Sequence, residues 1–275
     1  MSRPLAILSY PAIDPIALRL GPLNVHWYGL AYLAGFVSAF AIVRWLVRRW
    51  ELGLTDDDLL SITLAAVIGV IVGGRLGYVV AYGGRAYFTH PAEILAVWDG
   101  GMSFHGGLVG ILVAAAVVSR TMRIPWRTLC DLGAAAAPVG LFFGRLANFV
   151  NGELWGRVTT VPWAMVFPSA GPLPRHPSQL YEAALEGLVL LVVLIWIATR
   201  RPVVAQGTVL GWFLTLYGVF RVAVEFFRQP DVQIGFLPGG LTMGQLLSVP
   251  LVAAGVALLV WAQRRGLPQR GRATS

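Results

Sequence analysis

The sequence predicts an all-α integral membrane protein with about seven transmembrane helices. Hydrophobic residues make up 57% of its 275 residues and charged residues only 12%, whereas about 25% of a soluble globular chain is charged. The apolar residues gather in runs of about 20, the length that a helix needs to cross a bilayer. Because a spanning segment must satisfy its backbone hydrogen bonds internally, these runs are predicted as helices.

Seven apolar runs are long enough to be spans. The third run is short, and we expect it to extend further or to tilt. The predicted spans are residues 25–46, 60–82, 104–119, 128–150, 179–199, 207–227 and 242–262. Together they form one transmembrane domain over residues 25–262.

The segments outside the spans are short. Residues 1–24 contain prolines and charged residues but not the apolar core of a cleavable signal, so they are predicted to be an amphipathic segment on the outer surface. The loops 83–103 and 151–178 form a small outward-facing region, and the stretch "TTVPWAMVF" in the second is typical of a strand. Residues 263–275 are predicted to be a disordered, basic cytoplasmic tail.

The placement of arginines predicts the orientation in the membrane. The net charge is +8, and all 21 basic residues are arginines. By the positive-inside rule the face that carries most of them is cytoplasmic, so the N-terminus lies outside and the C-terminus inside. The positive net charge is therefore explained by the membrane topology, and no nucleic-acid partner is expected. The arginines on that face are Arg44, Arg48, Arg49, Arg120, Arg123, Arg127, Arg200, Arg201, Arg264, Arg265, Arg270 and Arg272.

Three further arginines lie inside predicted spans, where a charge costs at least about 2.5 kcal/mol at the centre. Arg75, Arg145 and Arg221 fall in the outer halves of three different spans. Other polar residues begin or end spans at the same depth, which predicts a polar cavity open to the outer side. These residues are His26, Tyr28, His105, Asn148, Asn151, Glu153, His176, Gln179, Tyr181, Glu182, Tyr217 and Glu225.

Structural explanations remain open for parts of this pattern. Arg145 and Glu153 are also compatible with a purely structural ion pair, and His105 with a satisfied buried histidine. Glu182 and Glu186 are interpreted as acidic residues near a helix N-terminus, where the helix dipole favours them. Glycines at four-residue spacing indicate close helix packing rather than a binding site: Gly69, Gly73, Gly77, Gly106 and Gly110.

The residue types of the predicted cavity indicate phosphate chemistry. An arginine guanidinium matches phosphate oxygens with two parallel hydrogen bonds and keeps its charge. At the depth of the outer leaflet, the available phosphate is a phospholipid head group. A nearby histidine can accept a proton from a nucleophile. No metal-ligand cluster, nucleotide loop or Ser-His-Asp order is readable, so neither a metal nor a cofactor is predicted.

Several segments resemble the signature segments of the prolipoprotein diacylglyceryl transferases of bacterial plasma membranes. They are "VHWYGLAYLAG", "SFHGGLVG", "GRLANFVNGELWGRVT", "RHPSQLYE" and "YGVFRVAVEFFRQPD", and the resemblance covers residues 24 to 262. It implies a multi-pass inner-membrane enzyme with its active site toward the outer leaflet. Its partners would be phosphatidylglycerol and lipobox-containing preprolipoproteins. The diacylglyceryl group would pass to the lipobox cysteine thiol, forming a thioether and releasing glycerol phosphate.

The resemblance and the residue chemistry together suggest a function for each polar residue. His105 is the candidate base, and Arg145 and Arg221 are the candidate phosphate clamps. The remaining candidates would bind substrate or orient the arginines: His26, Tyr28, Arg75, Asn148, Asn151, Glu153, Tyr217 and Glu225. The competing interpretation is a transporter or flippase for an anionic lipid or solute, which should show repeat symmetry and polar groups through the whole bilayer.

Overall fold

The computed structural model describes residues 8–11, 13–21, 23–82, 86–97, 100–230 and 235–272. Within this part of the chain, seven helical segments are long and apolar enough to cross a membrane, which confirms the predicted all-α, multi-pass fold. The third span runs two residues past its predicted end. The segments are α1 (Trp27–Arg49), α2 (Asp56–Tyr82), α4 (Phe104–Thr121), α5 (Trp126–Val150), Ser178–Ala198, α8 (Thr208–Glu225) and α9 (Met243–Arg265).

The chain divides into two compact units, and each is described by itself. The first unit comprises Met1–Val43 and Asp131–Pro268, and the second comprises Arg44–Cys130 and Gln269–Ser275. The divisions cut α1 near its C-terminal end and α5 near its N-terminal end.

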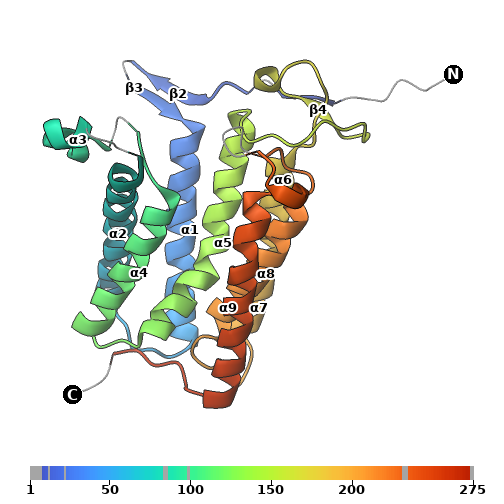
Figure 1. Ribbon diagram of the computed structural model, residues 1–275. Helices are drawn as coiled ribbons and strands as arrows, with labels where there is room; N and C mark the ends of the chain where they lie inside the picture. Colours follow the sequence, from blue (N-terminus) through green and yellow to red (C-terminus); the bar gives the residue numbers. More distant parts are fainter. Residues whose placement is uncertain are drawn as a thin grey trace. The chain divides into compact units, whose positions relative to one another are not determined.

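In the second unit, α2 and α4 pack directly on one another through glycines (Figure 1). A Cβ atom on Gly73 would lie 2.4 Å from the carbonyl oxygen of Gly106, and one on Gly110 would lie 1.9 Å from that of Gly69. The predicted close packing is therefore confirmed, because no side chain fits between these backbones. The loop between the two helices contains α3 (Ala86–Thr89) and the 3₁₀ helix η1 (Pro91–Leu95).

The substitution Gly110→Ala is expected to destabilise this helix pair by about 1–3 kcal/mol, the usual cost of overpacking, because its Cβ would meet backbone that cannot move aside. Thermal unfolding in detergent measures the effect. Gly133→Ala in α5 is the matched control, since nothing lies within 4 Å of its Cβ position. Equal melting temperatures for the two variants would show that Gly110 is not needed for the close packing of α4 on α2.

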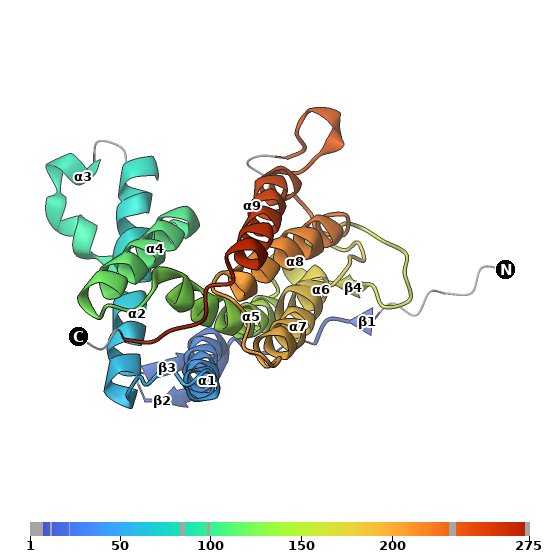
Figure 2. The same ribbon diagram turned by 90° about the horizontal axis from the view of Figure 1, so that it is seen from below.

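In the first unit, the span Ser178–Ala198 is not one continuous α-helix. It consists of α6 (Ser178–Glu182), a π-helical segment η4 (Ala183–Val189) and α7 (Leu190–Ala198). The helices α5, α7, α8 and α9 run side by side, and Figure 2 shows them from below. Gly187 in η4 permits the close approach of α5, because its Cβ would lie 2.7 Å from that of Phe142. π-Helical turns often accompany functional sites.

A buried carboxylate from α5 caps the N-terminus of α8. The side chain of Asp131 in α5 is fully buried and accepts hydrogen bonds from the backbone N–H groups of Gly207 at 2.7 Å and Leu210 at 2.8 Å. Gly207, at the N-cap, has a left-handed backbone with φ +87°. Asp131 thus satisfies N–H groups at the beginning of α8 that have no partner within the helix.

Short strands cover one end of the first unit. β1 (Leu8–Ser9) pairs in parallel with β4 (Met165–Val166), and β2 (Ile16–Leu20) pairs antiparallel with β3 (Leu23–His26). β4 confirms the strand expected in "TTVPWAMVF", although only two residues are paired. The Tyr10 hydroxyl lies 2.7 Å from the carbonyl oxygens of both Phe149 and Val150, which ties the N-terminal segment to the end of α5. Two short 3₁₀ helices are η3 (Pro168–Ala170) and η5 (Pro238–Gly240).

The C-terminal tail is more ordered than predicted. Gln206 binds it twice, donating from its backbone N–H to the carbonyl of Leu267 and from Nε2 to that of Pro268, both at 2.8 Å. In the second unit, Arg272 lies 3.8 Å from Asp58. Residues 266–272 therefore make contacts that the expected disorder did not predict, with Gln206 just before α8 and with Asp58 in α2. Residues 273–275 lie outside the described part.

Candidate active site

Three arginines and three glutamates form one charged cluster in the first unit. The cluster joins the last turns of α5 and α8, the residues just after α8, and the beginning of the span that holds η4. Its members are Arg145, Arg221, Arg228, Glu182, Glu186 and Glu225. With all six ionised, the positive and negative charges cancel, which explains how this part of the chain tolerates arginines inside apolar helices.

Glu182 is the central carboxylate of the cluster. One of its oxygens, Oε2, lies 2.6 Å from Nε of Arg145 and 3.5 Å from Nη1 of Arg221. The other, Oε1, lies 3.2 Å from Nη1 of Arg228. A single carboxylate from α6 therefore meets arginines from α5, from α8 and from the residues after α8.

Glu186 lies one turn further along, in η4. Its carboxylate oxygens are 3.7 Å from Nη2 of Arg145 and 3.6 Å from Nη1 of Arg221. These separations are too long for hydrogen bonds, and neither oxygen has a hydrogen-bond partner. Glu186 thus acts on the two arginines through charge alone.

The third carboxylate, Glu225, pairs with Arg221 one helical turn before it, as the four-residue spacing predicts. α9 begins against this carboxylate, since a Cβ on Gly244 would lie 2.3 Å from its Oε1. The N-terminus of a helix favours negative charge. The Thr242 side chain caps that helix by accepting from the Gln245 N–H at 3.2 Å.

Two of the arginines in the cluster are less deeply buried than its glutamates. The side chains of Glu182 and Glu186 are 0% exposed, whereas those of Arg145 and Arg221 are 18% and 15% exposed. An anion such as a phosphate is the ligand that Arg145 and Arg221 suit.

The counterions of Arg145 differ from the one predicted. Glu153 was expected to orient an arginine, but its Oε1 instead accepts from Nδ2 of Asn148 at 2.8 Å and of Asn151 at 3.5 Å. The partners of Arg145 are Glu182 and Glu186, whose interpretation as helix N-terminal charges was incomplete. Their four-residue spacing, which places both on one helical face, was the sequence signal that could have identified them.

The remaining candidates of the first unit lie at the ends of its helices. Asn148 is buried near the end of α5, whereas Glu153 is exposed. Tyr217 lies one turn before Arg221 in α8 and stacks on Phe213, with ring centroids 5.7 Å apart. Their binding of a substrate stays a prediction.

His26 and Tyr28 flank the junction of β3 and α1. His26 ends β3, and Tyr28 packs on Tyr32 at 5.0 Å in the first turn of α1. Their proposed contacts with substrate also stay predictions.

A second polar group surrounds Tyr181, one of the polar residues expected at the beginning of the fifth span. Its hydroxyl accepts from Nε1 of Trp163 at 2.6 Å and lies 3.1 Å from Nδ1 of His176. Burial lowers the pKa of His176, which favours the neutral ring. His176 also packs against Phe227, just before the cluster residue Arg228.

His105 and Arg75 belong to the second unit. His105 is exposed in the first turn of α4, and its ring meets that of Phe104 at 5.6 Å. Arg75 is buried in α2 and donates to backbone carbonyl groups. Because the charged cluster belongs to the first unit, the predicted approach of His105 to its arginines stays a prediction.

Comparisons with known proteins agree with one another. A family model described as prolipoprotein diacylglyceryl transferase matches residues 15–261. The chain is 51% identical over 259 residues to the phosphatidylglycerol–prolipoprotein diacylglyceryl transferase of Geobacter sulfurreducens, across 94% of this chain and 98% of that relative. It is 53% identical over 269 residues to the protein of the same name from Methylocella silvestris, across 94% and 97%. It is 50% identical over 264 residues to that of Pseudomonas aeruginosa, across 96% and 98%.

Proposed function

Because the chain belongs to the prolipoprotein diacylglyceryl transferase family, we propose that it transfers the diacylglyceryl group of phosphatidylglycerol to the lipobox cysteine thiol of preprolipoproteins. The family that the sequence motifs indicate is confirmed. The relatives cover nearly the whole chain and are named as transferases, so an enzyme is favoured over a transporter or flippase.

The observation that supports the proposal most directly is the pair of partly exposed arginines in the charged cluster. Arg145 and Arg221 are partly exposed above fully buried glutamates. The phosphodiester of phosphatidylglycerol carries one negative charge, and two guanidinium groups can share its oxygens. The buried carboxylates hold these groups in place before the lipid binds, so little reorganisation is needed during the reaction.

In the proposed reaction, the cysteine sulfur attacks the glyceryl carbon that carries the phosphate. The new bond joins sulfur to carbon, and the bond from that carbon to the phosphate oxygen breaks. Its electron pair stays on the oxygen, so the departing glycerol phosphate gains negative charge. Arg145 and Arg221 stabilise that charge, most strongly where water is excluded.

The attacking thiol must lose its proton. A free cysteine has a pKa of about 8.5, so near neutral pH most of it is the poorly nucleophilic thiol. We assign His105 as the base that accepts this proton. Asn148, Asn151 and Tyr217 are assigned to the glycerol and ester oxygens of the lipid.

We further propose that the reaction takes place at the outer leaflet of the bacterial inner membrane. The arginine-rich ends Arg48–Arg49 of α1, Arg120 of α4 and Arg264–Arg265 of α9 would face the cytoplasm, by the positive-inside rule. The charged cluster lies near the opposite ends of α5 and α8, so with this orientation it would lie toward the outer side.

Purified protein in detergent, incubated with phosphatidylglycerol and a lipobox peptide, tests the proposed function. We expect a mass increase of one diacylglyceryl group on the cysteine and release of glycerol phosphate. A peptide with serine in place of cysteine is the control. If lipid moved between the leaflets of reconstituted vesicles while no thioether formed, a flippase would replace the enzyme.

The substitution His105→Gln is expected to slow transfer by about 10²- to 10⁴-fold, the usual contribution of general base catalysis, while lipid binding is retained. Raising the pH from 6 to 9 should partly rescue the variant, because more of the cysteine ionises unaided. Single-turnover rates across this range measure the effect. His90→Gln, an exposed histidine of the same unit, is the matched control. A deficit that stays constant with pH would show that His105 only orients other groups.

A further inference from the structure

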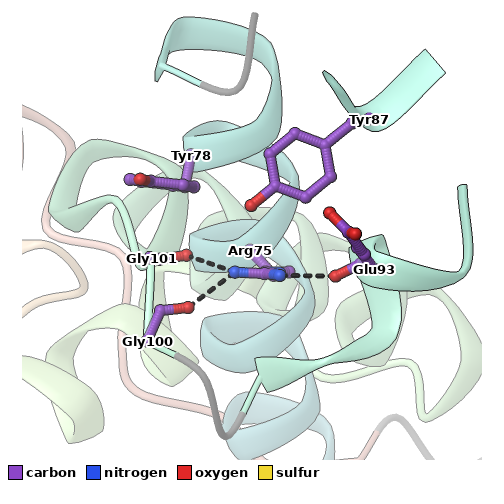
Figure 3. A pocket seen from close by; sticks show the side chains of 6 residues that line it. All are labelled: Arg75, Tyr78, Tyr87, Glu93, Gly100 and Gly101. Carbon is purple, nitrogen blue, oxygen red and sulfur yellow. Dashed lines mark hydrogen bonds between the residues drawn. The ribbon is translucent and has the colours of Figure 1, made fainter. Parts of the chain in front are cut away.

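Arg75 commits most of its hydrogen-bond donors to the protein backbone. The residue is 5% exposed, and its guanidinium donates from Nε to the carbonyl of Ile94 at 2.9 Å, from Nη2 to Glu93 at 2.5 Å, and from Nη1 to Gly100 at 2.6 Å and Gly101 at 3.1 Å (Figure 3). A guanidinium has five N–H groups, and four of them bind carbonyl groups of residues that the structure describes. One remaining N–H group cannot form the paired hydrogen bonds that make arginine a phosphate clamp.

The guanidinium joins two separate parts of the loop between α2 and α4. Glu93 and Ile94 belong to η1, whereas Gly100 and Gly101 directly precede α4, and Figure 3 shows Arg75 between them. The rings of Tyr78 and Tyr87 also adjoin the guanidinium, at 6.0 and 5.4 Å from Cζ. A small cavity of ≈ 200 Å³ is lined by Arg75, Tyr78, Tyr87, Glu93, Gly100 and Gly101. The planar fork therefore acts as a cross-link within the loop.

Gly101 is shaped for this contact in two ways. Its φ of +73° is a conformation that residues with a side chain rarely adopt. A Cβ on Gly101 would also lie 2.7 Å from the Tyr78 ring and 2.8 Å from Nη1 of Arg75. Only glycine brings its carbonyl this close to the guanidinium.

The same backbone leads directly to His105. After Gly101, the N–H of Ser103 donates to the carbonyl of Gly74, the residue before Arg75, at 2.8 Å. The Ser103 hydroxyl then accepts from the N–H of Gly106 at 3.2 Å and caps α4. His105 is the second residue of that helix. The position of the first turn of α4 relative to α2 thus depends on adjacent contacts made by Gly74 and Arg75.

We propose that Arg75 is a positioning residue for His105, acting through the backbone of residues 100–103 and not through the lipid. The inference rests on the proposed function, in which His105 accepts the thiol proton. It replaces the substrate-binding function that the sequence suggested for Arg75. Lysine should not substitute, since three donors on one nitrogen cannot reach carbonyl groups on both sides.

The steady-state kinetics of Arg75→Met and Arg75→Lys test the proposal. We expect kcat to fall by about 10²-fold in both, the effect of a small misplacement of a catalytic group, while KM for phosphatidylglycerol changes little. Arg120→Met, at the other end of α4, is the matched control with an exposed arginine. A large rise in KM with kcat preserved would overturn the proposal and make Arg75 a lipid ligand.

A double-mutant cycle of Arg75→Met and His105→Gln tests whether Arg75 affects the transfer rate only through His105. If Arg75 acts only through His105, adding Arg75→Met to His105→Gln should slow transfer by less than about twofold, because interdependent residues are not additive. If Arg75→Met slowed transfer as much in the His105→Gln background as it does in the wild-type protein, the proposal would be overturned.

Hydrogen exchange of the backbone amides measures the cross-link without any reaction. We expect exchange at residues 103–107 to accelerate at least about tenfold in Arg75→Met and in Gly101→Ala, as the first turn of α4 opens locally, while α9 is unchanged. Unchanged exchange in both variants would overturn the proposal. If the wild-type protein lacked transferase activity, the proposed function would fail, but this measurement would still report on the cross-link.

Discussion

Replacing Arg145 with lysine is expected to lower transfer by about 10²- to 10³-fold, the usual effect of removing one donor that stabilises developing charge. Nε of Arg145 lies 2.6 Å from Oε2 of Glu182, an ion pair that holds the guanidinium while the side chain stays 18% exposed. A lysine keeps the charge but presents its donors from a single nitrogen, so it cannot bind the buried carboxylate and two phosphate oxygens at once. Transfer to a lipobox peptide, with kcat and KM measured separately, tests this expectation.

The matched control for Arg145→Lys is Arg120→Lys, which makes the same chemical change at an exposed arginine of α4. The control should retain wild-type kinetics. A fall in kcat for Arg145→Lys at unchanged folding would place the effect in the transition state. Near-normal turnover would show that Arg145 serves only to neutralise the buried glutamates.

Replacing Glu182 with glutamine should destabilise the protein by about 3–5 kcal/mol, the usual cost of removing one partner from a buried ion pair. Its carboxylate is 0% exposed and meets Arg145, Arg221 and Arg228, so its loss leaves the cluster with an uncompensated positive charge. Thermal unfolding in lipid-containing micelles measures the change. Activity should be lost as well, because the two phosphate-binding arginines lose their common anchor.

Two further variants test whether charge balance is the cause. Glu93→Gln makes the same change at an exposed glutamate and should leave the unfolding temperature unchanged. Adding Arg228→Gln to Glu182→Gln removes the excess positive charge, and part of the lost stability should return. If the double variant were less stable by the sum of the two single effects, packing rather than charge would account for the importance of Glu182.

The sequence by itself determined the spans of this protein. Bilayer thickness and the need to satisfy backbone hydrogen bonds act on local length and composition, so an apolar run reveals a span without any knowledge of its neighbours. The glycine spacing of α2 and α4 predicted their close packing for the same reason, since a helix presents every fourth residue on one face. The motifs that carry Arg145 and Arg221 also indicated the family.

Only the tertiary structure decided which glutamates form ion pairs with which arginines. Arg145 and Glu153 are near in sequence, yet the arginine binds Glu182 and Glu186 on another helix. A long side chain meets whichever residues the packing of helices brings within a few ångströms, and helix packing is not a local property of the chain. The environment of Arg75 was undetermined for the same reason. A buried arginine demands compensation, but whether a lipid phosphate or backbone carbonyl groups provide it depends on how the following loop folds back over α2.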